Sequence, residues 1–247
     1  MRSAEHDVTP ERYAALVAPL VDRAFVAGMR APRERGGRAV AARHGGPSAV
    51  WGLVEFRTSL AWPGRVVTGP QWRAVWRYRS VDDGVRWIAE RAAAGTLEPV
   101  EDGFRAAPTG LAFLHDAYAA QDEVLEVHWG AAASPLLAPL STAAAAAPST
   151  GGLAYAAMTP TYEPAGGWRP GLRVLDLLTA LRYHRSDAHA AAWAADGLTA
   201  AGIAALTGGP RRDAIEAETN RRAAPPWGAL TPPSRTGLLD ALVALPG

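Results

Sequence analysis

The chain has 247 residues, a net charge of +1 and no cysteine, which excludes disulfides, thiolate zinc sites and cysteine nucleophiles. All 25 basic side chains are arginines, so lysine-dependent chemistry, such as Schiff-base formation, is excluded as well. Nucleic-acid-binding proteins usually carry a basic excess, and this charge balance does not favour that function. We expect a cytoplasmic protein with no secretory signal and no membrane partner, because no apolar segment follows the basic residue at the start of residues 1–7 and no uncharged apolar run is long enough to span a bilayer.

The first 60 residues predict two helices. Thr9 and Pro10 form a good cap and first turn, and an apolar stripe follows, so residues 10–30 are predicted to be helical. Residues 30–47 are rich in arginine and glycine and are predicted to be a loop or an irregular crossing. A second helix is expected over residues 48–60, before Trp62-Pro63-Gly64.

Residues 68–120 have the element order of a winged helix. A short helix is predicted over 68–77, and a second over 80–94, with Ser80 as its cap and Gly95 at its end. Strands over 96–100 and 104–107 flank an acidic turn, and a helix begins after Pro108. The phrase GTLEPVEDGFRAAPTGLAFL is similar to the wing of MarR-like regulators. The predicted fold is therefore mainly α with a small β-hairpin wing, a winged helix-turn-helix within a helical region 1–130.

The second half is expected to be a separate helical domain. Residues 131–170 contain an alanine run among Pro, Ser, Thr and Gly, which predicts a linker or long loop. Residues 171–247 then contain a long helix (172–195), two short ones (199–206 and 211–222) and a final helix near Leu238–Leu242. A weak internal repeat relates the stretch from Ala214 to the stretch from Trp87, so this domain is either a degenerate second winged helix of a tandem pair or a chance likeness.

The C-terminal third resembles a known family. LRYHRSDAHAAAWAADGL (181–198) and IEAETNRRAAPPWGAL (215–230) are similar to two phrases of the actinobacterial SalK-like family of predicted helix-turn-helix proteins. In that family the wing pattern lies between the two phrases, whereas here the gap is short. The resemblance implies a regulator-like protein that is often linked to natural-product biosynthesis.

The densest polar cluster lies on the predicted helix 172–195. His184 and Asp187 share one face, whereas His189 lies about 140° from His184 on the face of Arg185. One straight helix therefore cannot aim both histidines at one metal, and we predict no metal site. We interpret His184, Asp187 and His189 as candidate acid–base residues around a ligand. The alternative is an internal polar network between the halves.

Aromatic and polar side chains elsewhere suggest the wall of a ligand pocket. The chain has nine tryptophans, most of which are expected in the core, with some available to line an aromatic pocket. The candidate ligand-binding residues are Tyr183, Arg185, Trp193, Trp227, His128, Trp129 and Glu126. Glu216, Thr219 and Asn220 are interpreted mainly as local backbone partners.

The predicted recognition helix, 80–94, carries the wrong charges for reading DNA. Its first turn contains Asp82 and Asp83, which repel phosphates and instead favour the helix dipole. Arg86 and Arg91 are its candidate DNA contacts, and the wing tip is acidic too. We therefore expect a small-molecule-binding protein, with an enzyme of secondary metabolism and a DNA-binding repressor as alternatives. The cofactor is unknown, and a homodimer is an open possibility.

Overall fold

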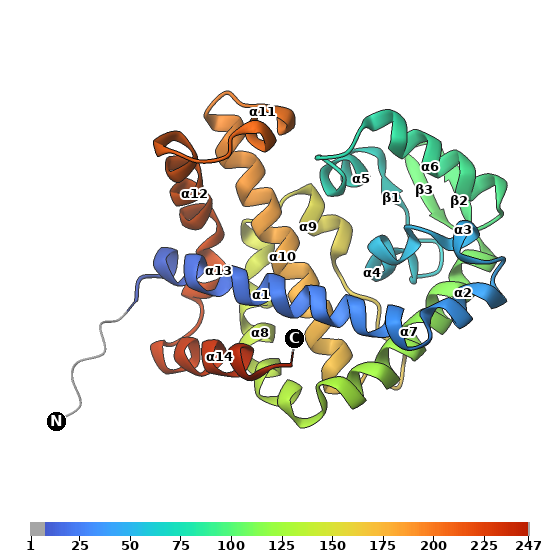
Figure 1. Ribbon diagram of the computed structural model, residues 1–247, viewed down its shortest axis with the longest axis horizontal. Coiled ribbons are helices and arrows are strands. Elements are labelled where there is room, and N and C mark those ends of the chain that lie inside the picture. Colours follow the sequence, from blue (N-terminus) through green and yellow to red (C-terminus); the bar gives the residue numbers. More distant parts are fainter. Residues whose placement is uncertain (1–7, 247) are drawn as a thin grey trace.

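The computed structural model describes residues 8–246. It is mainly helical, with one small three-stranded antiparallel sheet among the described residues (Figure 1), and so confirms the predicted mainly α fold with a small hairpin. Residues 1–7, on which the expectation about a secretory signal rests, lie outside the described residues.

The elements up to residue 128 are α1 (Pro10–Pro32), the π-type turn η1 (Arg33–Gly37), α2 (Arg38–Arg43), α3 (Pro47–Val50), the 3-10 turn η2 (Leu53–Phe56), α4 (Arg57–Leu60), β1 (Val67–Thr68), α5 (Gly69–Val75), α6 (Val81–Ala93), β2 (Leu97–Val100), β3 (Gly103–Ala106) and α7 (Pro108–His128). They are followed by η3 (Gly130–Ala133), α8 (Ser134–Ala146), η4 (Ala147–Ser149), α9 (Leu153–Met158), α10 (Pro170–Ala195), α11 (Ala200–Ala205), α12 (Pro210–Ala223), α13 (Pro225–Gly228) and α14 (Pro232–Ala244).

The predicted hairpin is present as β2 and β3, and a strand that the sequence did not predict completes the sheet. Its order is β1-β3-β2, with Val67 paired to Phe104 and Leu97 paired to Ala106. β1 has only two residues, too few for an alternating pattern to be recognised. Gly110 brings α7 close to the hairpin, because a Cβ there would lie 2.0 Å from the carbonyl oxygen of Thr96.

An aromatic cluster holds α5 and α6 against the sheet. The rings of Trp76 and Trp87 lie 4.7 Å apart between centroids, and Phe56 meets Phe104 edge-on at 5.7 Å. All four side chains are buried. The Trp87 indole also donates a hydrogen bond of 2.6 Å to the carbonyl of Trp51, and the four rings are part of the large core that continues into the second half of the chain.

Helix α10 is the central helix of the molecule. It packs against α1, α7, α8, α9 and α12 (Figure 1), which explains why apolar side chains occur around most of its circumference. The predicted helix 172–195 is confirmed, and Gly197 follows it with φ of +72°, the left-handed conformation common just after a helix. Because so many elements contact α10, its polar side chains form hydrogen bonds and ion pairs that link neighbouring elements.

The prediction of a linker over 131–170 is wrong for most of its length. Residues 130–149 are helical, and Leu136, Leu140, Ala143 and Ala147 are fully buried at helical spacing. Alanine is the best helix former, and its small side chain lets α8 pack closely on α10. Only residues 150–152 and 159–169 lack helix and strand. The Pro and Ser signals failed because Pro135 occupies the first helical turn, where proline is tolerated, and because α8 continues through Pro139 at the cost of one helical hydrogen bond.

The same segment tests the expectation that no apolar run of the chain is long enough to span a membrane. Within the described chain, one helical stretch, Gly130–Ser149, is long and apolar enough by length and composition to cross a membrane, with a mean hydropathy of 1.2. The expectation that no run of this kind exists is therefore corrected. One face of the stretch packs against α10, and 28% of its apolar window is buried.

Three further predictions need adjustment. Residues 30–47 are not a simple loop, because α1 continues to Pro32 and α2 follows a kink at Gly36, where φ is +136°. The helix expected over 48–60 is divided into α3, η2 and α4. Beyond Ala106 the described part of the chain contains no strand, so the second half has no wing.

Candidate functional site

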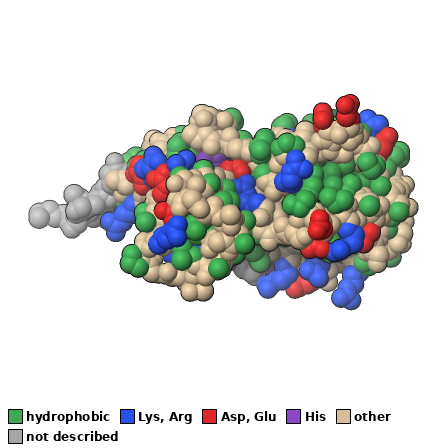
Figure 2. Space-filling model, turned by 90° about the horizontal axis from the view of Figure 1, so that it is seen from above, with side chains coloured by type: hydrophobic (Ala, Val, Ile, Leu, Met, Phe, Trp, Pro, Cys, Tyr) green, Lys and Arg blue, Asp and Glu red, His purple; other side chains and the backbone are tan. Residues whose placement is uncertain are grey.

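A cleft of about 600 Å³ lies between α10, α12 and the loop after α5. Viewed from above in Figure 2, arginine, acidic and histidine side chains gather between the two sides of the molecule. The lining includes four arginines and three carboxylates, together with aromatic side chains. The volume is typical of small-molecule sites, and the charges leave a small positive excess.

One face of α10 supplies much of the lining. Arg182, Arg185, Ser186 and His189 follow each other at intervals of one, three or four residues, which places them on one side of a helix. Trp193 continues the same stripe just beyond the cleft. The predicted site residues Tyr183, Arg185 and His189 are therefore brought together, and the expectation that His189 lies on the face of Arg185 is confirmed.

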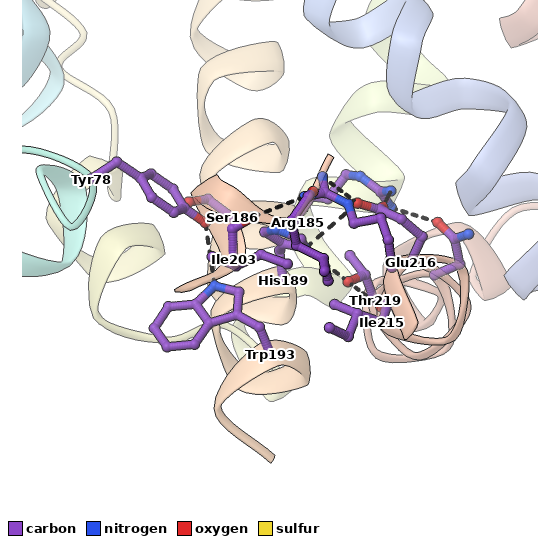
Figure 3. Close-up of polar contacts among 12 residues, drawn as sticks. Tyr78, Arg185, Ser186, His189, Trp193, Ile203, Ile215, Glu216 and Thr219 are labelled. Atoms are coloured by element: carbon purple, nitrogen blue, oxygen red, sulfur yellow. Dashed lines mark hydrogen bonds and ion pairs between the residues drawn. The ribbon is translucent and has the colours of Figure 1, made fainter. Parts of the chain in front are cut away.

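Glu216 of α12 anchors the opposite wall (Figure 3). Its carboxylate forms an ion pair with Arg212 at 2.9 Å and a longer one with Arg185 at 3.5 Å. Arg185 also donates a hydrogen bond of 2.8 Å to the side chain of Asn220. Arg185 is thereby held between α10 and α12.

His189 is held in a defined tautomer. Thr219 uses its single hydroxyl hydrogen to bond the carbonyl of Ile215 at 2.8 Å, so its oxygen must accept the 3.0 Å bond from Nδ1 of His189. The ring proton therefore lies on Nδ1, and Nε2 carries a lone pair. Burial lowers the pKa of His189, and nearby arginines lower it further against the opposing effect of Glu216. The imidazole is consequently neutral at pH 7, and among the described residues its Nε2 has no hydrogen-bond partner.

Tyr183 supplies a hydrogen-bond donor to the same cleft. Burial raises the pKa of Tyr183 to about 12, and the charge of Glu55 contributes, so the phenol keeps its proton at neutral pH. Within residues 8–246 its hydroxyl has no hydrogen-bond partner. At the rim the indole of Trp193 donates a 3.3 Å bond to the hydroxyl of Tyr78 (Figure 3). The cleft therefore has a free donor, a free acceptor and an aromatic edge.

The candidate catalytic set does not form one site, because His184 and Asp187 face α9. His184 is buried, and its Nε2 lies 2.8 Å from the hydroxyl of Thr150. Asp187 accepts hydrogen bonds from the backbone N–H groups of Ala154 (3.2 Å) and Tyr155 (2.8 Å). It also pairs with Arg77 at 2.5 Å. For these two residues the alternative of an internal network is the better description.

Besides Trp193, which lies just beyond the cleft, four more of the candidate ligand-binding residues lie outside it. Trp227 is buried against Tyr13, with ring centroids 5.8 Å apart, and Trp129 is buried and donates to the carbonyl of Pro246 at 3.2 Å. His128 stacks on Trp129, and Glu126 is exposed near the end of α7. Tryptophan is mostly a core residue, and composition alone does not distinguish the few that line a pocket.

The two candidate DNA contacts on α6 are already engaged. Arg91 is buried and donates to the carbonyl of Trp51 at 3.3 Å, which corrects its assignment as a contact residue. Arg86 is exposed but forms an ion pair with Asp83 in the first turn of the helix. Neither guanidinium is a free partner for phosphate on this surface.

Several residues of the cleft were not among the predicted site residues, and most of them come from segments far away in the sequence. Their side chains lie at the junction only after folding, and no local motif marks them: Asp22, Glu55, Val75, Trp76, Tyr78, Arg79, Arg182 and Arg212. Only Glu216 and Thr219 carried a signal, through the Ile-Glu-x-x-Thr phrase.

Among the described residues no three or more His, Cys, Asp or Glu side chains are grouped to hold a metal ion. Comparison of the chain with protein-family models, curated proteins and solved structures gave no match. The resemblance to the SalK-like family therefore stays a prediction.

Proposed function

We propose that the chain is a small-molecule-binding protein, with a winged-helix unit as its scaffold and the cleft between α10 and α12 as its ligand site. The order β1-α5-α6-β2-β3 with the strand order β1-β3-β2 supports the winged-helix assignment. The resemblance to SalK-like and MarR-like proteins supports a regulator-like origin.

The observation that carries the proposal is the pair of unpartnered polar groups in the cleft. Both His189, with the acceptor Nε2, and Tyr183, with a hydroxyl donor, line the cleft, so a ligand with a matching donor and acceptor can pair with both groups. Each lining arginine pairs with a lining carboxylate, but Arg185 and Arg212 share Glu216, and the remaining excess of one positive charge favours an anion. The aromatic side chains Trp76 and Tyr78 favour a flat ring. The ligand class that fits is an aromatic acid with a hydroxyl group.

The probe for this class is 4-hydroxybenzoate, titrated calorimetrically at pH 7. We expect saturable binding to the unmodified chain. In His189→Asn the side-chain amide takes the place of Nδ1, keeps the bond to Thr219 and removes the acceptor Nε2. Binding should then weaken about tenfold, the cost of leaving one ligand hydroxyl without its partner.

Arg173→Ala is the matched control. Arg173 lies on the same helix but pairs with Glu163 outside the cleft at 3.7 Å, so its removal should leave the affinity unchanged. Equal weakening in both variants, or no binding to the unmodified chain, would contradict the proposed site.

A second candidate function is general-base catalysis, and the neutral His189 with its exposed lone pair favours it. A base in this position would remove a methyl proton of 4-hydroxyacetophenone, and in D₂O deuterium would replace it. Exchange that exceeds the buffer rate, followed by proton NMR and lost in His189→Asn, would favour an enzyme. Exchange at the buffer rate with intact binding would favour a ligand-binding protein.

A further inference from the structure

A second cavity, of about 840 Å³, lies on the other side of α1, between η1, α2, α3 and α7. In Figure 1, α2, α3 and α7 lie close together on the right side of the molecule. Its wall is largely apolar, with Met29 from α1, Val50 from α3, and Phe113 and Ala117 from α7. None of the residues assigned to the first cleft lines this cavity.

One polar side chain in this wall has no adequate partner. Gln121 is 4% exposed, and its Oε1 has no hydrogen-bond partner among the described residues. Its Nε2 lies 3.8 Å from the sulfur of Met29, which is a weak acceptor. Exchanging the two amide atoms leaves the same deficit. A buried amide in this state costs about 1–3 kcal/mol, a cost that a polar group on a bound molecule would remove.

The mouth of the cavity carries positive charge. Arg33 and Arg38 line it, and both also line an adjoining hollow of about 560 Å³ together with Arg30 and Glu34, which pair with each other at 3.5 Å. Both are exposed, and in the described part of the chain neither forms an ion pair or side-chain hydrogen bond. The kink at Gly36 between α1 and α2 places the two guanidinium groups at this opening.

The arginines at the mouth and the buried amide of Gln121 lie at different positions along the axis of α1. Met29 and Arg33 are four residues apart, so they lie on the same side of α1 about 6 Å apart along its axis. Gln121 contacts Met29, and the anion-binding end and the buried amide are thus separated by roughly one helical turn. A ligand whose carboxylate binds Arg33 and Arg38 would place a hydroxyl group near Gln121 if that hydroxyl group lay close to the carboxylate in the ligand.

We infer that this cavity is a second ligand site, for a medium-chain β-hydroxy acid. The apolar chain would fill the space beside Val50 and Phe113, the carboxylate would bind Arg33 and Arg38, and the hydroxyl would donate to Gln121. This inference does not depend on the first cleft.

The test uses decanoate and 3-hydroxydecanoate, titrated calorimetrically into the full chain below their aggregation concentrations. We expect 3-hydroxydecanoate to bind at least fivefold more tightly than decanoate. In Gln121→Leu, which replaces the amide by an apolar group of similar size, this preference should disappear while decanoate binds at least as well. Since the readout is a ratio of two affinities on one variant, a general loss of stability would not imitate it.

Charge at the mouth is tested separately. The double variant Arg33→Ala/Arg38→Ala should lose about tenfold in affinity for both acids, whereas Arg35→Ala, an exposed neighbour that lines neither hollow, should bind normally. His189→Asn should bind both acids normally as well. Failure of the proposed cleft between α10 and α12 can therefore be distinguished from failure of this second site. Absence of saturable binding, a preference that persists in Gln121→Leu, or equal loss in Arg35→Ala would overturn the inference.

Discussion

Replacing Asp176 by alanine is expected to lower the free energy of unfolding by about 3–5 kcal/mol. Asp176 of α10 forms an ion pair at 2.7 Å with Arg57 of α4, and the two side chains are only 4% and 1% exposed. Burial raises the pKa of Asp176 to about 6, and Arg57 opposes this, so the carboxylate is still ionised at pH 7. Without it, the guanidinium of Arg57 would be a buried charge with only Thr179 as a hydrogen-bond partner, at 3.3 Å.

Urea unfolding at pH 7 measures this loss. Glu98→Ala, which breaks the exposed pair with Arg105, is the matched control and should cost less than about 1 kcal/mol. The double variant Arg57→Met/Asp176→Leu should recover most of the stability, because well-packed apolar side chains can replace a buried pair. Equal losses of unfolding free energy in Asp176→Ala and Glu98→Ala would contradict the importance of the buried Arg57–Asp176 ion pair.

Acidification is expected to destabilise the chain through His184. Burial lowers the pKa of His184 to about 4, although Asp187 raises it, while the unfolded imidazole titrates near 6.5. Since the folded pKa is the lower one, the unfolded state binds the proton first. The stability contribution is complete above pH 6.5 and is lost as the pH falls towards 4, by about 3 kcal/mol over this window.

The comparison of the unmodified chain with His184→Gln isolates this effect from the carboxylates that titrate in the same range. Glutamine keeps a polar group beside Thr150 but does not titrate. Unfolding free energies at pH 7 and pH 4.5 should differ markedly less in the variant. A loss of the same size in both proteins would show that His184 is not the group responsible.

Local patterns in the sequence predicted the elements that have local causes. The Thr9-Pro10 cap, the Ser80 cap and the Gly197 terminus mark helix ends that occur where expected. The segment 131–170 failed because a helix of small residues is recognised only by what packs against it, and α10 is distant in the sequence. The division of 48–60 into three short pieces likewise follows from tertiary packing.

The site could be predicted only in part, for a related reason. Helical spacing correctly separated His184 from His189, and it placed Arg185 with His189. The tautomer of His189 depends on Thr219, thirty residues away, and the aromatic rim depends on Tyr78 from the other side of the molecule. Such contacts are set by the crossing of α10 and α12, which no local pattern specifies.

The measurement that tests the cleft most directly is a two-dimensional ¹H–¹⁵N spectrum of the histidine ring nitrogens at pH 7, with and without 4-hydroxybenzoate. His189→Asn identifies the signals by their loss. We expect a neutral ring with its proton on Nδ1, and an Nε2 resonance that shifts as the acid binds. A proton on Nε2, or an Nε2 resonance that does not move at saturating acid, would contradict the proposed ligand site.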